Sequence, residues 1–243
     1  MDIILYNIVV GFCSLLFGYF FGSIPTGVII GKIFFHRDPR QEGSHNSGGT
    51  NVGRVFGKKV GLLVIVFDML KCAIPTISVW AIIKFSCLKD ALASDTWTSF
   101  NVLYMYLAPL GVAIGHCWPI FAGFKGGKAV ATFSGFIITS CWLGLIVGLI
   151  SFFTTLKLKK YVSLSSIIMS ISVSILTWVM FLIKSVIPSF NTDVFMWGCG
   201  NFLICGWEFA IVTTLIAFIL IVRHKANITR LKNGNERKIS WMK

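Results

Sequence analysis

The sequence predicts an all-α integral membrane protein that crosses the bilayer several times. Of its 243 residues, 56% are hydrophobic and 13% are charged, whereas a soluble domain carries about 25% charged residues. Several apolar runs reach the roughly 20 residues that a helix needs to cross a bilayer. Lys and Arg gather at the ends of these runs and give a net charge of +13. This excess favours anionic lipid or anionic substrates, and its placement argues against nucleic acid as a partner.

Six apolar runs are candidates for membrane helices. They cover residues 3–35, 60–86, 103–122, 129–156, 162–187 and 195–222. The first run follows Met1-Asp2, with no basic segment before it and no small-residue cleavage site. We therefore expect an uncleaved span rather than a signal peptide.

The basic linkers set the expected orientation. Lys and Arg are dense in 36–59, 157–160 and 223–243, and sparse in 87–102 and 188–194. The positive-inside rule places the three basic linkers in the cytoplasm, which six single crossings cannot achieve.

Two short segments within 129–156 would resolve this conflict. Gly135, Ser140 and Gly144 favour a break near residue 140, and segments this short are tilted or shielded by protein. We therefore expect seven transmembrane helices, with the N-terminus outside and the C-terminus in the cytoplasm. The alternative is one long tilted helix whose flanking charges violate the rule.

The first polar loop reads GSHNSGGTNVGR and covers 43–54. Glycine-rich backbone can wrap an anion with its N–H groups, and Arg54 adds a planar fork suited to phosphate. Neutral donors are supplied by Ser44, Asn46, Thr50 and Asn51. No carboxylate occurs from 43 to 67, which favours an anion site over a flexible polar linker.

The second polar loop lies in GHCWPIFAGFKGGKAVAT, residues 115–132. It is not a Walker A loop, because Ala122 and Ala129 stand where Gly and Ser or Thr are needed. Lys125 and Lys128 flank two glycines before an apolar helix, which suits phosphate; the alternative is a basic anchor at a helix end. His116 lies near the end of the preceding span, where a lone His is more often a structural hydrogen-bonding residue than a base.

The third polar segment is RHKANITRLKNGNE, residues 223–236. If the last helix continues, Arg223, His224, Asn227 and Arg230 share one face. An amphipathic tail on anionic lipid is the alternative.

Charged residues also occur inside the apolar runs. Asp68 and Lys71 are three residues apart, and such pairs mark either a functional site or an internal salt bridge. Glu208 is expected in the middle of the span formed by 195–222, and the sequence reveals no partner for it.

The sequence gives little support for a bound catalytic metal or for acyl transfer from a thioester. The carboxylates are dispersed, no Cys/His quartet exists, and the seven cysteines form no CxxC pair, so a tightly held metal is not expected. The H-x-x-x-x-D signature of many glycerolipid acyltransferases is absent. The residues five positions beyond the four histidines are Gln41, Thr50, Phe121 and Thr229.

With these motifs, the sequence resembles the bacterial acyl-phosphate:glycerol-3-phosphate acyltransferase family, PlsY. The resemblance covers nearly the whole chain and is densest in GSIPTG…DPRQEGSHNSGGTNVGR, FDMLK, GHCWPIFAGFKGGKAVAT and RHKANITRL. The first motif of the family usually reads GSGNPGATN. Here His45, Ser47 and Gly49 replace its Gly, Pro and Ala, and Ala129 stands where Gly is usual.

The resemblance implies one acyltransferase domain over 1–243, with motif loops at about 36–59, 123–128 and 223–236. The implied reaction moves a fatty acyl group from acyl phosphate, rather than from acyl-CoA or acyl carrier protein, to the 1-hydroxyl of glycerol 3-phosphate. Lysophosphatidic acid and phosphate are the products, and the reaction is the first acylation step of phospholipid biosynthesis. No cofactor is expected. The implied location is the bacterial plasma membrane, with the site facing the cytoplasm and a functional link to the enzyme that makes acyl phosphate.

The motif positions also imply site residues. The catalytic set is Ser44, Asn46, Thr50, Asn51, Arg54 and Lys128, and the substrate-binding set is Lys125, His116, Arg223, His224 and Asn227. Because the three loops are short of carboxylates, we expect no side chain to act as an essential base. A phosphate oxygen of a substrate would take the hydroxyl proton instead. The rival functions are an anion transporter or channel, for which the spans carry few polar residues, and a non-catalytic membrane scaffold.

Overall fold

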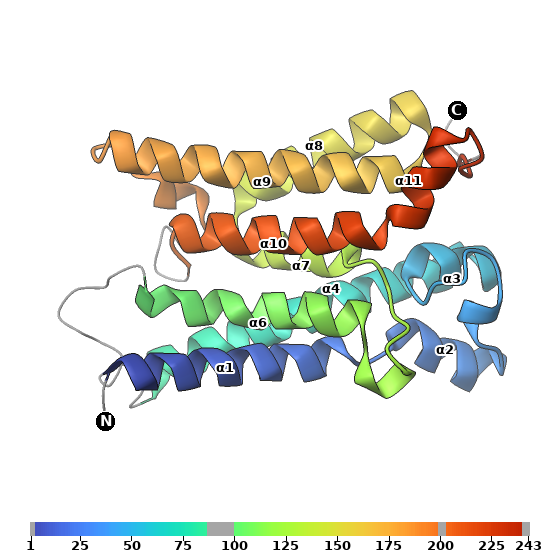
Figure 1. Cartoon of the computed structure of the whole chain (residues 1–243), viewed down its shortest axis with the longest axis horizontal. Helices are drawn as coiled ribbons and strands as arrows, with labels where there is room; N and C mark the ends of the chain where they lie inside the picture. The colour runs from blue at the N-terminus through green and yellow to red at the C-terminus, as the bar shows by residue number, and fades with distance from the viewer. Residues whose placement is uncertain (1–2, 87–99, 199–202, 240–243) are drawn as a thin grey trace. The chain divides into compact units, whose positions relative to one another are not determined.

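A computed structural model of the chain describes residues 3–86, 100–198 and 203–239 (Figure 1). Within them the regular elements are helices, apart from one isolated β-bridge, so the all-α prediction is confirmed. The chain forms two compact units, residues 1–139 and 140–243, which are described separately below. Residues 87–99 of the predicted outer linker, together with Cys87 and Cys199, lie outside the described residues.

In the part of the first unit that the structure describes there are six helices and two single 3-10 turns. The helices are α1 (Ile3–Gly22), α2 (Thr26–Phe35), α3 (Gly49–Val55), α4 (Lys58–Phe85), α6 (Phe100–Cys117) and α7 (Val130–Ser140), the last ending at the unit boundary; the turns are Pro39–Gln41 and Ile120–Ala122.

Helices α1 and α6 run parallel, side by side, because glycines remove the side chains between them (Figure 1). A Cβ on Gly18 would lie 2.0 Å from the carbonyl oxygen of Ala108, and one on Gly111 would lie 2.1 Å from that of Leu15. Small residues at such positions let membrane helices pack backbone to backbone. Gly135 of α7 approaches the Met69 carbonyl of α4 in the same way.

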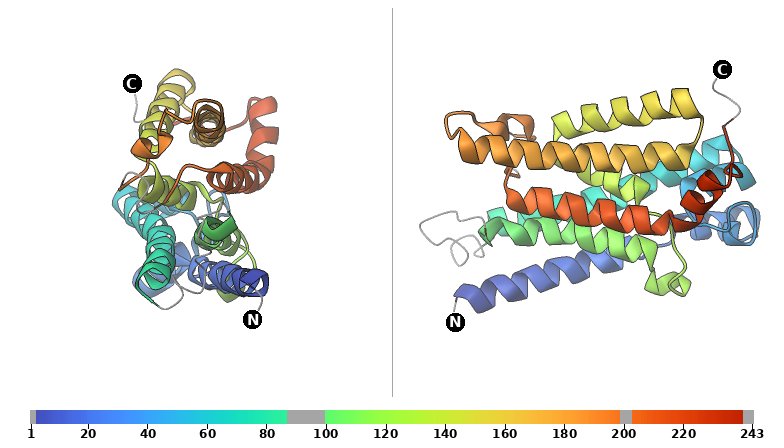
Figure 2. Two further views of the ribbon diagram at one scale, coloured as in Figure 1. Left: turned by 90° about the vertical axis from the view of Figure 1, so that its left-hand side faces the viewer. Right: turned by 45° about the horizontal axis from the view of Figure 1, so that its top comes forward.

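The described residues of the second unit, 140–198 and 203–239, form four helices and the 3-10 turn Thr192–Phe195. The helices are α8 (Trp142–Lys159), α9 (Val162–Val186), α10 (Trp207–Arg223) and α11 (Lys225–Lys232). α8 and α9 form an antiparallel hairpin (Figure 2). The buried face of α9 is rich in serine. Most of these hydroxyls donate to carbonyls one turn earlier, such as Ser166 to Val162 at 2.9 Å, whereas Ser163 donates to the Glu236 carboxylate. The hydroxyls are thus hydrogen-bonded, and the serines keep the contact face of α9 small.

The break predicted near residue 140 is confirmed, because α7 ends at Ser140 and α8 begins at Trp142. Cys141 between them is extended, with φ −140° and ψ 110°, and forms a β-bridge with Met196. The Trp197 N–H donates to the Ser140 carbonyl at 3.1 Å. These bonds satisfy backbone groups that the broken helix leaves open, as irregular backbone at membrane depth requires.

Five stretches of the described residues are long and apolar enough to cross a membrane. They are Ile8–Phe35, Lys58–Phe85, Tyr104–Ala122, Trp142–Lys159 and Val162–Val186. The pair α10 and α11 makes a sixth if the two helices form one bent span. α7 has 11 residues and is about 16 Å long, roughly half of the hydrocarbon core.

Two expectations about the last helix need correction. Glu208 does not lie in mid-span: α10 begins at Trp207, so Glu208 is in its first turn, where the helix dipole favours a carboxylate. The helix also does not continue straight into the tail. α11 begins at Lys225 and is bent by 58° from α10, so the single face expected from Arg223 to Arg230 is interrupted at His224.

Candidate anion site

The first polar loop is built around the side-chain amide of Asn51. Its Oδ1 accepts hydrogen bonds from the Ser44 N–H at 2.7 Å and from the Ser44 hydroxyl at 3.0 Å. Its Nδ2 donates to the carbonyls of Pro39, Glu42 and Asn46 at 2.7, 3.1 and 2.8 Å. Asn51 is buried at the start of α3. One amide therefore organises residues 39 to 46, and Asn51 shapes the loop from inside.

Tight backbone geometry accompanies this network. Gly43 has φ +65°, and a Cβ there would lie 2.4 Å from Asn51 Oδ1, so only glycine fits. His45 has φ +53°, a left-handed conformation that costs a side-chain-bearing residue roughly 1–2 kcal/mol. Ala129 at the end of the second loop is also left-handed, with φ +59°. These are two of the positions where the family motif has glycine, and the backbone angles give the physical reason.

Arg40 links the first loop to the second. Its guanidinium bonds both oxygens of Asp38, with Nη2 to Oδ2 at 2.7 Å, and its Nη1 donates to the carbonyls of Ala122 and Lys125 at 2.8 and 3.3 Å. The hydrogen bonds from Arg40 hold the pKa of Asp38 below its ordinary value, and Asp38 raises the pKa of Arg40 in return. Arg40 thus joins loops rather than presenting a free fork to an anion.

Asn46 provides a second link between the two loops. Its Nδ2 donates to the Gly126 carbonyl at 3.1 Å, while its Oδ1 accepts from the Gly48 N–H at 2.9 Å. The Gly126–Gly127 turn packs on His116: a Cβ on Gly127 would lie 1.9 Å from His116 Nε2, and one on Gly126 would lie 2.1 Å from the His116 carbonyl oxygen. Side chains at either glycine would push the turn away.

The remaining predicted residues of this unit lie around the two joined loops. Thr50 and Arg54 are exposed and stand one turn apart on α3. Lys125 is exposed and Lys128 partly buried, on either side of the two glycines. The first unit therefore brings together eight of the predicted residues: Ser44, Asn46, Thr50, Asn51, Arg54, His116, Lys125 and Lys128.

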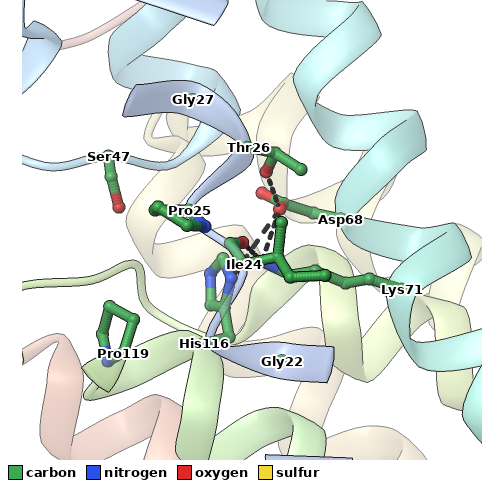
Figure 3. A pocket seen from close by; sticks show the side chains of 10 residues that line it. All are labelled: Gly22, Ile24, Pro25, Thr26, Gly27, Ser47, Asp68, Lys71, His116 and Pro119. Atoms are coloured by element: carbon green, nitrogen blue, oxygen red, sulfur yellow. Dashed lines mark hydrogen bonds and ion pairs between the residues drawn. The ribbon is translucent and has the colours of Figure 1, made fainter. Parts of the chain in front are cut away.

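A buried ionic cluster lies next to these loops (Figure 3). The Asp68 carboxylate is 2.9 Å from Lys71 Nζ and 3.8 Å from His116 Nδ1, and it accepts a hydrogen bond from the Thr26 hydroxyl. Asp68, Lys71 and His116 also line a small pocket that reaches Ser47 of the first loop. All three side chains are at least 94% buried.

In the second unit, the tail residues gather around Glu236. Its carboxylate accepts hydrogen bonds from Asn227 at 2.7 Å, Arg230 at 2.7 Å and Ser163 at 2.9 Å. Burial raises the pKa of Glu236, but these hydrogen bonds outweigh burial and leave the pKa below its ordinary value. His224 is buried, with Nδ1 2.8 Å from the Leu220 carbonyl oxygen.

Glu236 was missed by the sequence reasoning. Glu236 is nine residues beyond Asn227 in the sequence, and nothing there indicates that the two side chains are hydrogen-bonded. They meet because a turn after α11 folds the chain back. After that turn the Ile239 N–H donates to the Lys160 carbonyl at 2.8 Å. The tail thus docks on the turn between α8 and α9. Arg223, His224 and Asn227 are placed by this unit alone.

These features define a class of protein: a helical integral membrane protein with basic, glycine-rich loops that carry neutral and cationic hydrogen-bond donors. Among the described residues, no group of three His, Cys, Asp or Glu is arranged to hold a metal ion. A family model described as "Glycerol-3-phosphate acyltransferase" matches residues 12–234. The chain belongs to this family, and it is an acyltransferase of the PlsY type that serves phospholipid biosynthesis.

Relatives and solved structures agree. Proteins named glycerol-3-phosphate acyltransferase from Listeria monocytogenes serovar 1/2a and Staphylococcus carnosus are 39% and 36% identical, over 93% and 94% of this chain and 96% and 97% of theirs. The crystal structure of PlsY (YgiH) in its glycerol 3-phosphate form has a TM-score of 0.72 at 29% identity, covering 95% of this chain and 96% of that one. Its lysophosphatidic acid form gives 0.70 at 28%, covering 95% of each chain.

Proposed function

We propose that this acyltransferase moves a fatty acyl group from acyl phosphate to the 1-hydroxyl of sn-glycerol 3-phosphate, releasing lysophosphatidic acid and phosphate. The observation that carries the proposal is the pair of joined loops in the first unit. They offer Ser44, Asn46, Arg54, Lys125 and Lys128, with no carboxylate from 43 to 67. The related crystal structures in glycerol 3-phosphate and lysophosphatidic acid forms support the acceptor and the product.

The chemistry of the loops favours acyl phosphate over a thioester as the donor. The acceptor hydroxyl attacks the carbonyl carbon, the carbonyl oxygen takes negative charge, and the C–O bond to phosphate then breaks. The hydroxyl proton passes to an oxygen of the leaving phosphate, so no protein base is needed. Preorganised donors aimed at the developing oxyanion are commonly the largest catalytic effect, and cations stabilise the departing phosphate.

Each predicted residue has a role in this scheme. Ser44, Asn46 and Thr50 donate to the phosphate and orient the carbonyl, and Asn51 acts by holding that loop in shape. Arg54 and Lys128 neutralise phosphate charge. The residues that hold glycerol 3-phosphate are His224 and Asn227, with support from Lys125, Arg223 and His116.

We also propose one domain over 1–243 with seven membrane segments, in which α7 is a half-length segment shielded by protein. The N-terminus is outside and the C-terminus is in the cytoplasm, because this arrangement places 36–59, 157–160 and 223–243 on the cytoplasmic side. The protein lies in the bacterial plasma membrane, its site opens to the cytoplasm, and it depends on the enzyme that supplies acyl phosphate.

Phosphate release by the purified protein tests this function. We expect release from palmitoyl phosphate only when glycerol 3-phosphate is present, no transfer from palmitoyl-CoA, and loss of turnover in Lys128→Ala. Lys157→Ala is the matched control, because Lys157 is an exposed lysine of another basic linker and should leave the rate unchanged. Transfer from palmitoyl-CoA at a comparable rate would reject the proposed donor.

A further inference from the structure

Asp68 and Lys71 of the buried cluster beside the second loop have no role in the scheme above, although burying two charged groups costs free energy. Asp68 and Lys71 both belong to α4, a candidate membrane span, and they are buried. Ionised groups at this depth are expensive and are retained where they serve a site. Part of their role is local, because Lys71 Nζ donates to the Ile24 carbonyl at 3.0 Å in the break between α1 and α2.

The hydrogen bond from Lys71 to the break between α1 and α2 does not explain why the Asp68 carboxylate also faces His116. Figure 3 shows the His116 ring next to the Asp68–Lys71 pair, and Nδ1 is 3.8 Å from Asp68 Oδ1. A carboxylate at this distance favours a hydrogen on Nδ1 and therefore one orientation of the ring. The attraction is stronger than it would be in water because both side chains are buried.

The opposite edge of the same ring shapes the second loop. Gly127 sits so close to His116 Nε2 that no Cβ fits between them, and the Gly127 N–H donates to the His116 carbonyl at 2.9 Å. Gly126 in turn gives its carbonyl to Asn46 of the first loop. A continuous line of contacts thus runs from Asp68 through His116 and the two glycines to both loops.

We propose that Asp68 is a positioning residue: its carboxylate orients His116, and His116 sets the Gly126–Gly127 turn that places Lys128 and Asn46 toward the anionic substrate. This inference rests on the proposed function, in that Lys128 and Asn46 are taken to bind phosphate. Asp68 itself touches no substrate.

A double-mutant cycle tests whether Asp68 acts through His116. Asp68→Asn and His116→Ala are each expected to lower kcat/KM by tenfold or more. The double variant should be no worse than the poorer single variant, because residues that act as one unit are not additive. Losses that multiply would overturn the proposal. Asp193→Asn is the matched control: Asp193 pairs with Lys184 at 2.7 Å in the second unit and should combine additively with His116→Ala.

Two further variants separate positioning from folding. Asp68→Asn/Lys71→Met removes both charges and so avoids an unpaired buried lysine. We expect its Tm to recover relative to Asp68→Asn while kcat/KM stays low; recovery of both would mean a merely structural pair. His116→Asn, whose amide nitrogen replaces Nδ1–H, should retain more activity than His116→Gln, and this preference should vanish in the Asp68→Asn background. Persistence of the preference there would contradict the proposal.

Failure of the proposed function would be visible separately. Wild-type protein that released no phosphate from palmitoyl phosphate would reject that function before any variant is compared. The same cycle would then be measured as the Kd for glycerol 3-phosphate, by calorimetry. Non-additive Kd changes would support the link from Asp68 through His116 to the loops, and additive changes would overturn it.

Discussion

The side-chain amide of Asn46 donates to the Gly126 carbonyl across 3.1 Å, and so joins two loops that are 80 residues apart in the chain. The other end of the same amide accepts the Gly48 N–H. Together with Arg40, which bonds the Ala122 and Lys125 carbonyls, this short side chain sets the spacing between the first loop and the two lysines of the second. Because acyl transfer depends on donors held in fixed geometry, this spacing should govern turnover.

We predict that Asn46→Ala lowers kcat/KM for glycerol 3-phosphate by roughly 10- to 100-fold, corresponding to about 1.4–2.8 kcal/mol of lost transition-state stabilisation. Steady-state phosphate release measures the effect. Gln41→Ala serves as the control, because Gln41 is an exposed amide of the same segment. Equal rates for Asn46→Ala and the wild type would show that the loops keep their spacing without this bond.

The helices and their breaks follow from the sequence more directly than the side-chain hydrogen bonds of the loops do. Glycines, amides and an absence of carboxylates predict a phosphate loop, because backbone N–H groups can line an anion site, and this stays a prediction. They could not show that Asn51 turns inward, because Asn46 and Asn51 look alike in sequence and differ only in what surrounds them. The break at Cys141 was readable from charge, whereas its β-bridge to Met196 depends on residues 55 positions away.

The inward orientation of Asn51 makes a sharp stability prediction. Asn51→Asp keeps the shape but replaces the NH2 group with oxygen, so three carbonyls lose their donor and face a negative charge. We expect a loss of roughly 2–4 kcal/mol, since each unsatisfied buried group costs about 1–3 kcal/mol. Thermal unfolding should show a clearly lower Tm, and Asn235→Asp, an exposed amide, should not. An unchanged Tm in Asn51→Asp would refute the inward role.

Low pH should break the ion pair between Asp38 and Arg40. The folded-state pKa of Asp38 lies below its ordinary value, so the ion pair stabilises the protein above the unfolded pKa of about 3.9. The stabilisation is lost as pH falls through the lower folded pKa. We predict that the Tm gap between wild type and Asp38→Asn is largest near neutral pH and closes below about pH 4. Other carboxylates titrate in both proteins and cancel; a gap independent of pH would contradict the prediction.

His45 offers a test of backbone strain in the first loop. It is exposed and left-handed, with φ +53°, and its Nδ1 is 3.2 Å from the Arg40 carbonyl oxygen.

Glycine pays no steric penalty at this angle and alanine does, so we predict that His45→Gly is more stable than His45→Ala by about 1 kcal/mol. The order should reverse at Ile150, which is exposed in the interior of α8, where alanine is favoured over glycine by about 1 kcal/mol. Thermal unfolding of the four variants measures both differences. If His45→Ala proved as stable as His45→Gly while the Ile150 pair differed as expected, the left-handed angle would not be a feature of the folded loop.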